Sequence, residues 1–427
     1  LHYPLRRQRQ MCIRDRGMDR CQGKEEASDD EINEMAKITK EAIEAGALGF
    51  STSRTYLHRD KFGEYVPGTE ATAKEMRKIA NTIADLGQGT LEIVSDWMDQ
   101  DIELDWVKEF VEKSDRTLTY AQTGGNPVET WKYCEENFSK GVKIRPQFPG
   151  RPTGMLFSLE STVHPFIAHP SYGEIADKTL EEKVAIMKDE SFRQKILSEE
   201  PAVDKNHMIY TLMMSFDKQF PMNEIPDYEP SYEESIAGIA ESSGKSVMEV
   251  MYDELLKNEG KTFVWAPFSP YPDHNLDTYK MMMEFESSVA GLSDGGAHCG
   301  LICDASMPTW NIAHYTRDRV KGDKIPLEFL IRKQTKETAE TFGLMDRGQI
   351  KEGYLADINI IDHENLCVYK PEMVHDLPTG SRRIIQKAGG YIATIKSGVV
   401  TFKNDQATGE LPGTVLRGER TAEAISA

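Results

Sequence analysis

The sequence predicts an α/β protein built on a parallel sheet, in barrel or open form, followed by a small β module. Two observations predict this. Between residues 28 and 148, short apolar runs typical of strands alternate four times with amphipathic runs typical of helices. Such alternation is characteristic of parallel strands joined by crossover helices. After about residue 350 the pattern changes to short strands separated by Gly and Pro.

The first predicted helix, residues 28–46, begins at a capping Ser28 or Asp29 and ends at Gly46. The alternation then continues with strand 47–50, helix 72–86, strand 90–95, helix 103–113, strand 117–122, helix 128–139 and strand 143–148. Polar side chains follow several of these strands. Because catalytic groups collect at the carboxyl ends of parallel strands, these positions are the first candidates for a site.

The sequence divides into three parts. Residues 1–16 form an Arg-rich segment unlike the rest, which we interpret as a non-native leader; residues 17–350 form the main domain and 351–427 the β domain. The main domain includes an insertion at about 157–260, with helices at 180–197 and within 227–257, and then a strand at 262–267. Helices 308–319 and 327–342 follow, and the β domain begins with strand 356–362 and continues with strands 391–397 and 399–403. Long excursions between strands commonly carry a lid or a substrate pocket.

Composition excludes several function classes. The 427 residues carry a formal charge of −19, which argues against nucleic acid or an anionic membrane as the main partner. The apolar runs are shorter than the ~18 residues of a membrane span. The six cysteines are scattered without a CxxC pair, which predicts free thiols and a reducing, cytoplasmic location. Nothing in the sequence indicates an oligomeric state.

One stretch, residues 289–300, organises the candidate site. An apolar run ends at Ser293 and Asp294, and the glycines that follow leave room beside the carboxylate. This pattern predicts a buried strand that delivers Asp294 to the mouth of the sheet, although a carboxylate that only satisfies loop amides would look the same. His298 is either a loop histidine or a proton relay beside Asp294.

Three motifs carry a family resemblance. They are GALGFSTS (46–53), SDGGAH (293–298) and the stretch from Arg332 to Asp362 that includes DRGQIKEGYLAD. Together they resemble the amidohydrolase superfamily, and most closely the branch with D-aminoacylases and N-acyl-D-amino-acid deacylases. The resemblance runs from about residue 32 to residue 416.

The resemblance implies a (β/α)8 barrel with a C-terminal β-sandwich part and one or two divalent metals, commonly zinc. A metal-bound hydroxide would attack an amide carbonyl, with Asp294 as metal ligand and proton shuttle and His298 as its neighbour in the catalytic set. Tyr56 matches a pocket tyrosine of the family. With Ser51, Arg54 and Arg151, it completes the predicted substrate-binding set. The arginines would fork onto a substrate carboxylate or, alternatively, pair with acidic groups of the protein.

The sequence departs from the family pattern at the metal site. It contains no His-x-His pair, and the strand ends Ser95-Asp96 and Gln122-Thr123 lie where the family usually places two further histidines. We therefore expect a barrel incomplete at its N-terminus, which binds divalent metal weakly or not at all as this chain alone, since a tight zinc site needs about four ligands.

The predicted function is hydrolysis of C–N bonds other than peptide bonds, with a small N-acyl-D-amino acid as the first substrate to test. One alternative is a catalytically silent barrel that binds a small acidic ligand, which the missing histidines favour. A second is a serine hydrolase, because residues 291–295 read G-x-S-x-G around Ser293. In that motif a helix follows at once, and here Gly296 and His298 follow instead.

Overall fold

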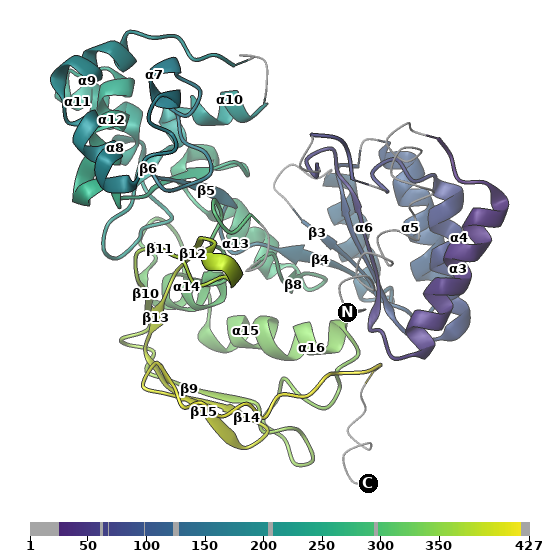
Figure 1. Cartoon of the computed structure of the whole chain (residues 1–427). Helices are drawn as coiled ribbons and strands as arrows, with labels where there is room; N and C mark the ends of the chain where they lie inside the picture. The colour runs from purple at the N-terminus through teal and green to yellow at the C-terminus, as the bar shows by residue number, and fades with distance from the viewer. Residues whose placement is uncertain are drawn as a thin grey trace.

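The structure is a computed structural model that describes residues 25–59, 63–66, 68–97, 99–122, 128–203, 208–293 and 298–419. Three parts are visible in Figure 1: a parallel sheet with its helices, a mainly helical part, and a C-terminal part with antiparallel strands. No helix in these ranges is long and apolar enough to cross a membrane.

The parallel sheet contains five strands in the order β1-β2-β3-β4-β8. These are β1 (Gly49–Arg54), β2 (Thr90–Ser95), β3 (Leu118–Ala121), β4 (Ile144–Phe148) and β8 (Val289–Ala290). Each neighbouring pair is parallel, so the predicted α/β class is confirmed. Neighbours in space follow the order of the chain, as they do in a barrel. Within the described residues β1 and β8 are the two edges, and closure of the barrel stays a prediction.

Four helices flank this sheet: α3 (Asp29–Glu44), α4 (Ala73–Leu86), α5 (Gln100–Lys113) and α6 (Val128–Phe138). Local signals set their starts. Ser28 and Glu31 form a capping box on α3, and the Thr72 hydroxyl accepts from the Glu75 amide at the start of α4. Ile79 and Val107 are fully buried in one core with Leu91 of β2, so this face of the sheet is covered by helices.

The segment between β4 and β8 folds partly as a second, antiparallel sheet of order β5-β7-β6. Its strands are β5 (Gly154–Phe157), β6 (Phe220–Pro221) and β7 (Val264–Pro267). The helices of this segment are α7 (Pro170–Gly173), α8 (Leu180–Met187), α9 (Glu190–Leu197), α10 (Met208–Met213), η1 (Phe216–Lys218), η2 (Tyr232–Glu234), α11 (Ile236–Ser243), α12 (Val247–Gly260), η3 (Pro272–His274) and α13 (Asp277–Glu284). The single helix predicted at 180–197 is two helices, because Asp189 caps a new one.

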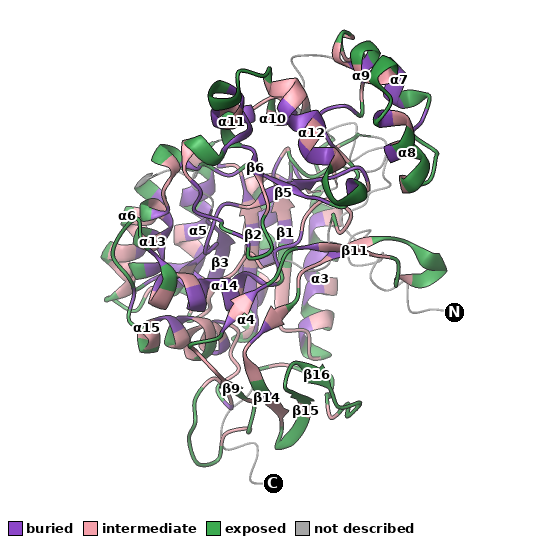
Figure 2. Ribbon diagram, turned by 90° about the vertical axis from the view of Figure 1, so that its left-hand side faces the viewer, coloured by how far each residue is buried: buried purple, intermediate pink, exposed green. Residues whose placement is uncertain are grey.

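The C-terminal part starts with α14 (Met307–Ala313), η4 (His314–Asp318), α15 (Leu327–Arg332), η5 (Lys333–Glu337) and α16 (Thr338–Thr341), where η4 and η5 are π-helical. The strands that follow are β9 (Ile358–Ile361), β10 (Cys367–Val368), β11 (Glu372–Val374), β12 (Arg383–Ile385), β13 (Ala388–Gly389), β14 (Tyr391–Lys396), β15 (Val399–Lys403) and β16 (Gln406–Ala407), with the short helix η6 (Pro378–Gly380) between β11 and β12. The strands predicted at 356–362, 391–397 and 399–403 correspond to β9, β14 and β15. Figure 2 shows β15 and β16 largely exposed.

A buried charge cluster joins η5 to the parallel sheet. The Glu337 carboxylate lies 3.1 Å from Arg145 of β4, 3.0 Å from Arg332 and 3.1 Å from Lys333. Lys333 is fully buried and also donates to the carbonyls of Phe285 and Ser288, just before β8. Burial lowers the pKa of Lys333, and Glu337 opposes that effect. The cluster therefore depends on all of its charges being present.

Candidate functional site

The inner face of the parallel sheet, opposite the helices, is polar. Side chains alternate along a strand, so Ser51 and Ser53 of β1 lie on the same face as their parallel partners Glu92 and Val94. On this face the amide of Gln147 donates to Glu92 and to Thr119, both at 3.0 Å. A polar, hydrogen-bonded inner face is suited to a small hydrophilic ligand rather than to a sealed apolar core.

The Gln147 side chain leaves no room for a side chain at position 291, so this position requires glycine. A Cβ there would lie 2.4 Å from the Gln147 side-chain oxygen, and 2.7 Å from its Cβ. Gly291 also donates its amide to the Phe148 carbonyl, at the end of β4. The chain leaving β8 is therefore held against β4 just before Ser293.

A cluster of polar side chains lies where β1 and β2 end. The Ser53 hydroxyl is 2.7 Å from Nδ1 of His58, which lies on the loop after β1. Two residues before that histidine, the Tyr56 amide donates to the Asp96 carboxylate at 2.8 Å. The Asp96 amide in turn bonds the Arg54 carbonyl at 3.4 Å. The loops after β1 and β2 are thus joined by backbone hydrogen bonds around Ser53, His58 and Asp96.

His58 also responds to the loop that follows β8. Its partial burial and the charge of His298 lower the pKa of His58, while the Asp96 carboxylate raises it, and the net shift is downward. His298 therefore lies close enough to act electrostatically on His58.

The predicted substrate-binding residues divide between two environments. Ser51 is exposed on the inner face, within β1 rather than after it, because the strand extends beyond the predicted end at residue 50. Tyr56 is half-buried and packs edge to face against Tyr65, with the ring centroids 5.0 Å apart. Arg54 lies on the helix-covered face, where its Nε donates to Glu103 of α5 at 2.8 Å. Of these three, Ser51 and Tyr56 lie nearest the cluster of Ser53 and His58.

Arg151 lies away from that cluster, in the core between the three parts of the molecule. Only 1% of its side chain is exposed. Its Nη1 is 2.9 Å from Asp304, and its guanidinium lies over the ring of Tyr228, 3.7 Å from the centroid. Its Nε and Nη2 are buried without a hydrogen-bond partner among the described residues. This environment gives Arg151 a packing and charge-pairing role, and a role in substrate binding stays a prediction.

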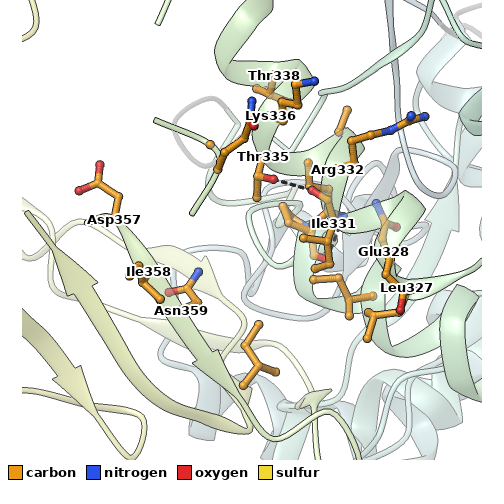
Figure 3. A pocket seen from close by; sticks show the side chains of 18 of the residues that line it. Leu327, Glu328, Ile331, Arg332, Thr335, Lys336, Thr338, Asp357, Ile358 and Asn359 are labelled. Atoms are coloured by element: carbon orange, nitrogen blue, oxygen red, sulfur yellow. Dashed lines mark hydrogen bonds between the residues drawn. The ribbon is translucent and has the colours of Figure 1, made fainter. Parts of the chain in front are cut away.

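Asp294, predicted as catalytic residue and metal ligand, lies outside the described residues. Ser293, just before it, lines a cavity of about 830 Å³ together with Gly291. Figure 3 shows this cavity between α15 and η5 on one side and the start of β9 on the other, where Asp357, Ile358 and Asn359 lie. The Ser293 environment is therefore distinct from the pair formed by Ser53 and His58.

The predicted site residues did not include Ser53 and His58, which the structure brings together near Asp96, a residue already noted at the end of a strand. Two weak signals pointed to them. Ser53 is the last inner-facing residue of the GALGFSTS strand, and His58 follows it by five positions. Asp96 stands where the resemblance implies a histidine. Without the pairing of β1 with β2, neither signal shows that these groups meet.

The described side chains do not fit the metal site that the resemblance implies. Among them, no group of three or more His, Cys, Asp or Glu is arranged to hold a metal ion. The Nδ1 of His58, which lies near Asp96, is placed against the Ser53 hydroxyl. We therefore derive no reaction step through a metal.

Comparison with known proteins identifies relatives across nearly the whole chain. The profile described as the amidohydrolase family matches residues 4–402, beginning inside the segment 1–16. D-aminoacylase of Alcaligenes xylosoxydans xylosoxydans is 33% identical over 105 residues, which is 25% of this chain and 19% of that protein. An uncharacterized protein of Mycobacterium tuberculosis is 22% identical over 407 residues, 89% of this chain and 64% of that protein. The chain thus spans less than two thirds of these relatives.

One solved structure resembles the fold. It is the N-acyl-D-glutamate deacylase of Bordetella bronchiseptica in complex with zinc and a phosphonate inhibitor that mimics the tetrahedral intermediate. The TM-score is 0.50 at 16% identity, over 95% of this chain and 70% of that one. At this identity the likeness concerns the fold, and the chemistry of this chain has to be argued from its own residues.

Proposed function

The chain belongs to the amidohydrolase family, and from that premise we propose that it hydrolyses C–N bonds of small N-acyl amino acids at the carboxyl ends of β1, β2 and β8. One observation supports the location: Ser53 and His58 form a hydrogen bond at the carboxyl end of β1, and Asp96 at the end of β2 accepts from the same loop. Amide hydrolysis needs a base for the attacking group and an acid for the leaving amine. A histidine beside a carboxylate can serve both steps.

His58 meets the requirement for a base. Its lowered pKa leaves the imidazole neutral at neutral pH, so one ring nitrogen is able to accept a proton. When the ring is protonated, the nearby Asp96 carboxylate stabilises the imidazolium. His298 acts in the opposite direction and favours return of the proton. Asp96 therefore favours proton uptake by the His58 ring, and His298 favours proton release from it.

Hydrolysis is tested with purified protein and a panel of N-acetyl-D- and N-acetyl-L-amino acids, with amine release as the readout. We expect release from acidic or neutral members of the panel. The variant H58Q should reduce the rate by about 10²–10⁴-fold, the usual contribution of a general base. H375Q is the matched control, because His375 is exposed in the C-terminal part. Equal rates for wild type and H58Q would contradict the proposed role of His58.

The resemblance still assigns a divalent metal, zinc in the first instance, to a site containing Asp294. We expect this chain to bind zinc weakly, because its described residues supply no cluster of three ligands. Titration calorimetry with zinc chloride on residues 17–427 measures this directly, with D294N as the comparison. Tight binding at one zinc per chain, lost in D294N, would show that the site is complete without further residues.

A second candidate function is binding without turnover. The poor fit of the described donors to a metal site favours a barrel that holds a small acidic ligand and does not cleave it. The same N-acyl amino acids distinguish the two functions. Saturable binding by calorimetry with no amine release would support the silent barrel, whereas release that depends on His58 would support the hydrolase.

A further inference from the structure

We propose that a cavity between η4 and β10 is a binding site for a small organic ammonium ion with an apolar body. The cavity has a volume of about 320 Å³ and lies where α14 and β10 are side by side (Figure 1). This volume is at the lower end of the range of small-molecule sites in proteins. The inference goes beyond the proposed hydrolase function and does not depend on it, because other residues line this cavity.

Part of the cavity wall is apolar and aromatic. Trp310 of α14 is buried, and its indole stacks on the ring of His314 with the centroids 4.3 Å apart. Val368 of β10 is also buried, whereas Ile225 lines the cavity with 69% of its surface exposed. A bound apolar group would take part of Ile225 out of water and pack against flat aromatic surface, and both contacts favour binding.

His314 offers a hydrogen-bond acceptor at the same wall. Its Nε2 is 2.8 Å from the Glu229 carboxylate, which Arg319 also bonds at 3.0 and 3.2 Å. A carboxylate held by a guanidinium is ionised and can only accept, so Nε2 carries the ring proton. In the neutral ring Nδ1 is then an acceptor, and no described group donates to it. An N–H group of a molecule in the cavity can therefore bond this nitrogen.

Asp227 supplies the negative charge that a cation requires. Three carboxylates line the cavity, and two of them are already paired with arginine. Glu229 lies 3.0 Å from Arg319, and Asp318 lies 2.6 Å from Arg317. The Asp227 carboxylate forms no ion pair among the described residues. Its Oδ1 accepts from the Glu229 amide at 2.7 Å, which holds the side chain in place.

These groups fit an organic cation better than a metal ion or an anion. A divalent metal needs several close ligands, and the described His, Cys, Asp and Glu side chains form no group of three suited to one. An anion would be attracted by Lys321, which also lines the cavity, and repelled by Asp227. The ammonium of Lys321 already donates to the His274 carbonyl, at 3.3 Å. An ammonium ion, by contrast, can donate to Asp227 and to His314 together.

The backbone of this wall is irregular as well. His314 and Asp318 are the first and last residues of η4, which is a π-helical turn. Such turns are rare and occur frequently at functional sites. Both residues line the cavity, so the irregular turn coincides with its wall. This observation is independent of the charges and of the aromatic stack.

The test is a ligand-observed NMR titration of the full chain with three compounds of similar size. Phenethylammonium carries the proposed charge, 2-phenylethanol is its uncharged counterpart, and 3-phenylpropionate is an anion. We expect phenethylammonium to bind with a Kd of about 1 mM or below, as suits so small a ligand. The alcohol should bind at least tenfold more weakly, and the anion should not displace phenethylammonium.

Two variants separate the charge from the apolar contact. D227N keeps the oxygen that accepts from the Glu229 amide and removes the charge, so it should weaken phenethylammonium at least tenfold and leave the alcohol unchanged. I225S should weaken both compounds several-fold, because it removes apolar surface from the wall. D85N is the matched control, since Asp85 is exposed on α4, and it should change neither affinity. Thermal melts confirm that each variant is folded.

Several results would overturn the proposal. They are equal affinities for phenethylammonium and 2-phenylethanol, displacement of phenethylammonium by the anion, an unchanged affinity in D227N, and no saturable binding of any of the three compounds. None of these results bears on the hydrolase, which is tested by amine release and by H58Q. Loss of that activity would likewise leave the binding experiment unaffected.

Discussion

Replacing Glu229 with glutamine is expected to lower the free energy of unfolding by about 3–5 kcal/mol, the cost of breaking a buried ion pair from one side. Glu229 is buried and bonds Arg319 twice, at 3.0 and 3.2 Å. It also accepts from His314 at 2.8 Å and from the Leu276 amide at 2.7 Å. The change leaves the fully buried Arg319 with a partial set of partners.

The effect of this substitution should depend on pH. Burial raises the pKa of Glu229, but the hydrogen bonds from His314, Arg319 and the Leu276 amide outweigh it and lower the pKa to about 2. A carboxyl whose folded pKa lies below its unfolded value stabilises the protein fully above the unfolded value of 4.5. That contribution is lost as pH falls from about 4.5 towards about 2. The difference between wild type and E229Q should shrink over the same range.

Urea denaturation followed by circular dichroism measures both effects, at neutral pH and at several acidic values. E233Q is the matched control, because Glu233 lies four residues away and is exposed. It should change stability by less than about 0.5 kcal/mol, as surface substitutions usually do. If E229Q and E233Q behave alike at neutral pH, the cluster around Glu229 contributes nothing measurable.

The second large effect is expected at Arg151 and Asp304. Their side chains are 1% and 3% exposed, and the guanidinium of Arg151 pairs with the Asp304 carboxylate and lies over the ring of Tyr228. D304N would remove the carboxylate that neutralises a buried cation and leave it over the Tyr228 ring, so we expect a loss of about 3–5 kcal/mol in unfolding free energy. R151M should cost a similar amount, because it leaves the carboxylate buried without its cation.

The double variant R151M/D304L tests the physical reason. Removing both charges together leaves no unpaired ion, so we expect it to be more stable than either single variant. R382M is the control, since Arg382 is exposed and should be near neutral when replaced. A double variant that loses the sum of the two single losses would show that packing, rather than charge pairing, dominates. Either way, R151M separates stability from the predicted role in substrate binding, which would appear as a raised KM in protein that is still folded.

Helices and strands whose own residues carry a cap or an apolar run could be predicted from the sequence. Strands whose ends or pairing depend on a distant strand were harder to predict. The helix from Asp29 and the strand Thr90–Ser95 were predicted closely, because a capping box and a buried apolar run are encoded within a few residues. The strand predicted to end at residue 50 continues to Arg54. The extension was not predicted because the inner face of the strand is polar, so the sequence there shows no apolar alternation. The strand predicted at 262–267 exists as β7, but it pairs antiparallel with β5, which periodicity alone does not reveal.

The candidate site shows the same limit. Sequence reasoning placed the site at the carboxyl ends of the parallel strands and named Ser51, Tyr56 and His298 there, and that location stays a prediction. It did not find Ser53, because a serine in a strand carries no sign of a histidine that folds back onto it. Arg54 was grouped with the site although it faces Glu103, since the one-residue alternation along β1 decides the direction of its side chain. Strand register and the path of the loops decide which residues meet, and both depend on contacts between residues far apart in the sequence.

The π-helical turn η5 has a consequence for how this protein tolerates changes in length. Its wider turn places Glu337 where Arg145, Arg332 and Lys333 all reach it. Removing one residue from Lys333–Glu337 would restore an α-helical turn and rotate everything after it by about 100° about the axis. Glu337 would then turn away from Arg145 of β4, whereas Arg332 and Lys333 would lie four and three residues before it and stay within reach. A change of helix length at this turn is therefore expected to cost the contact between Glu337 and the parallel sheet.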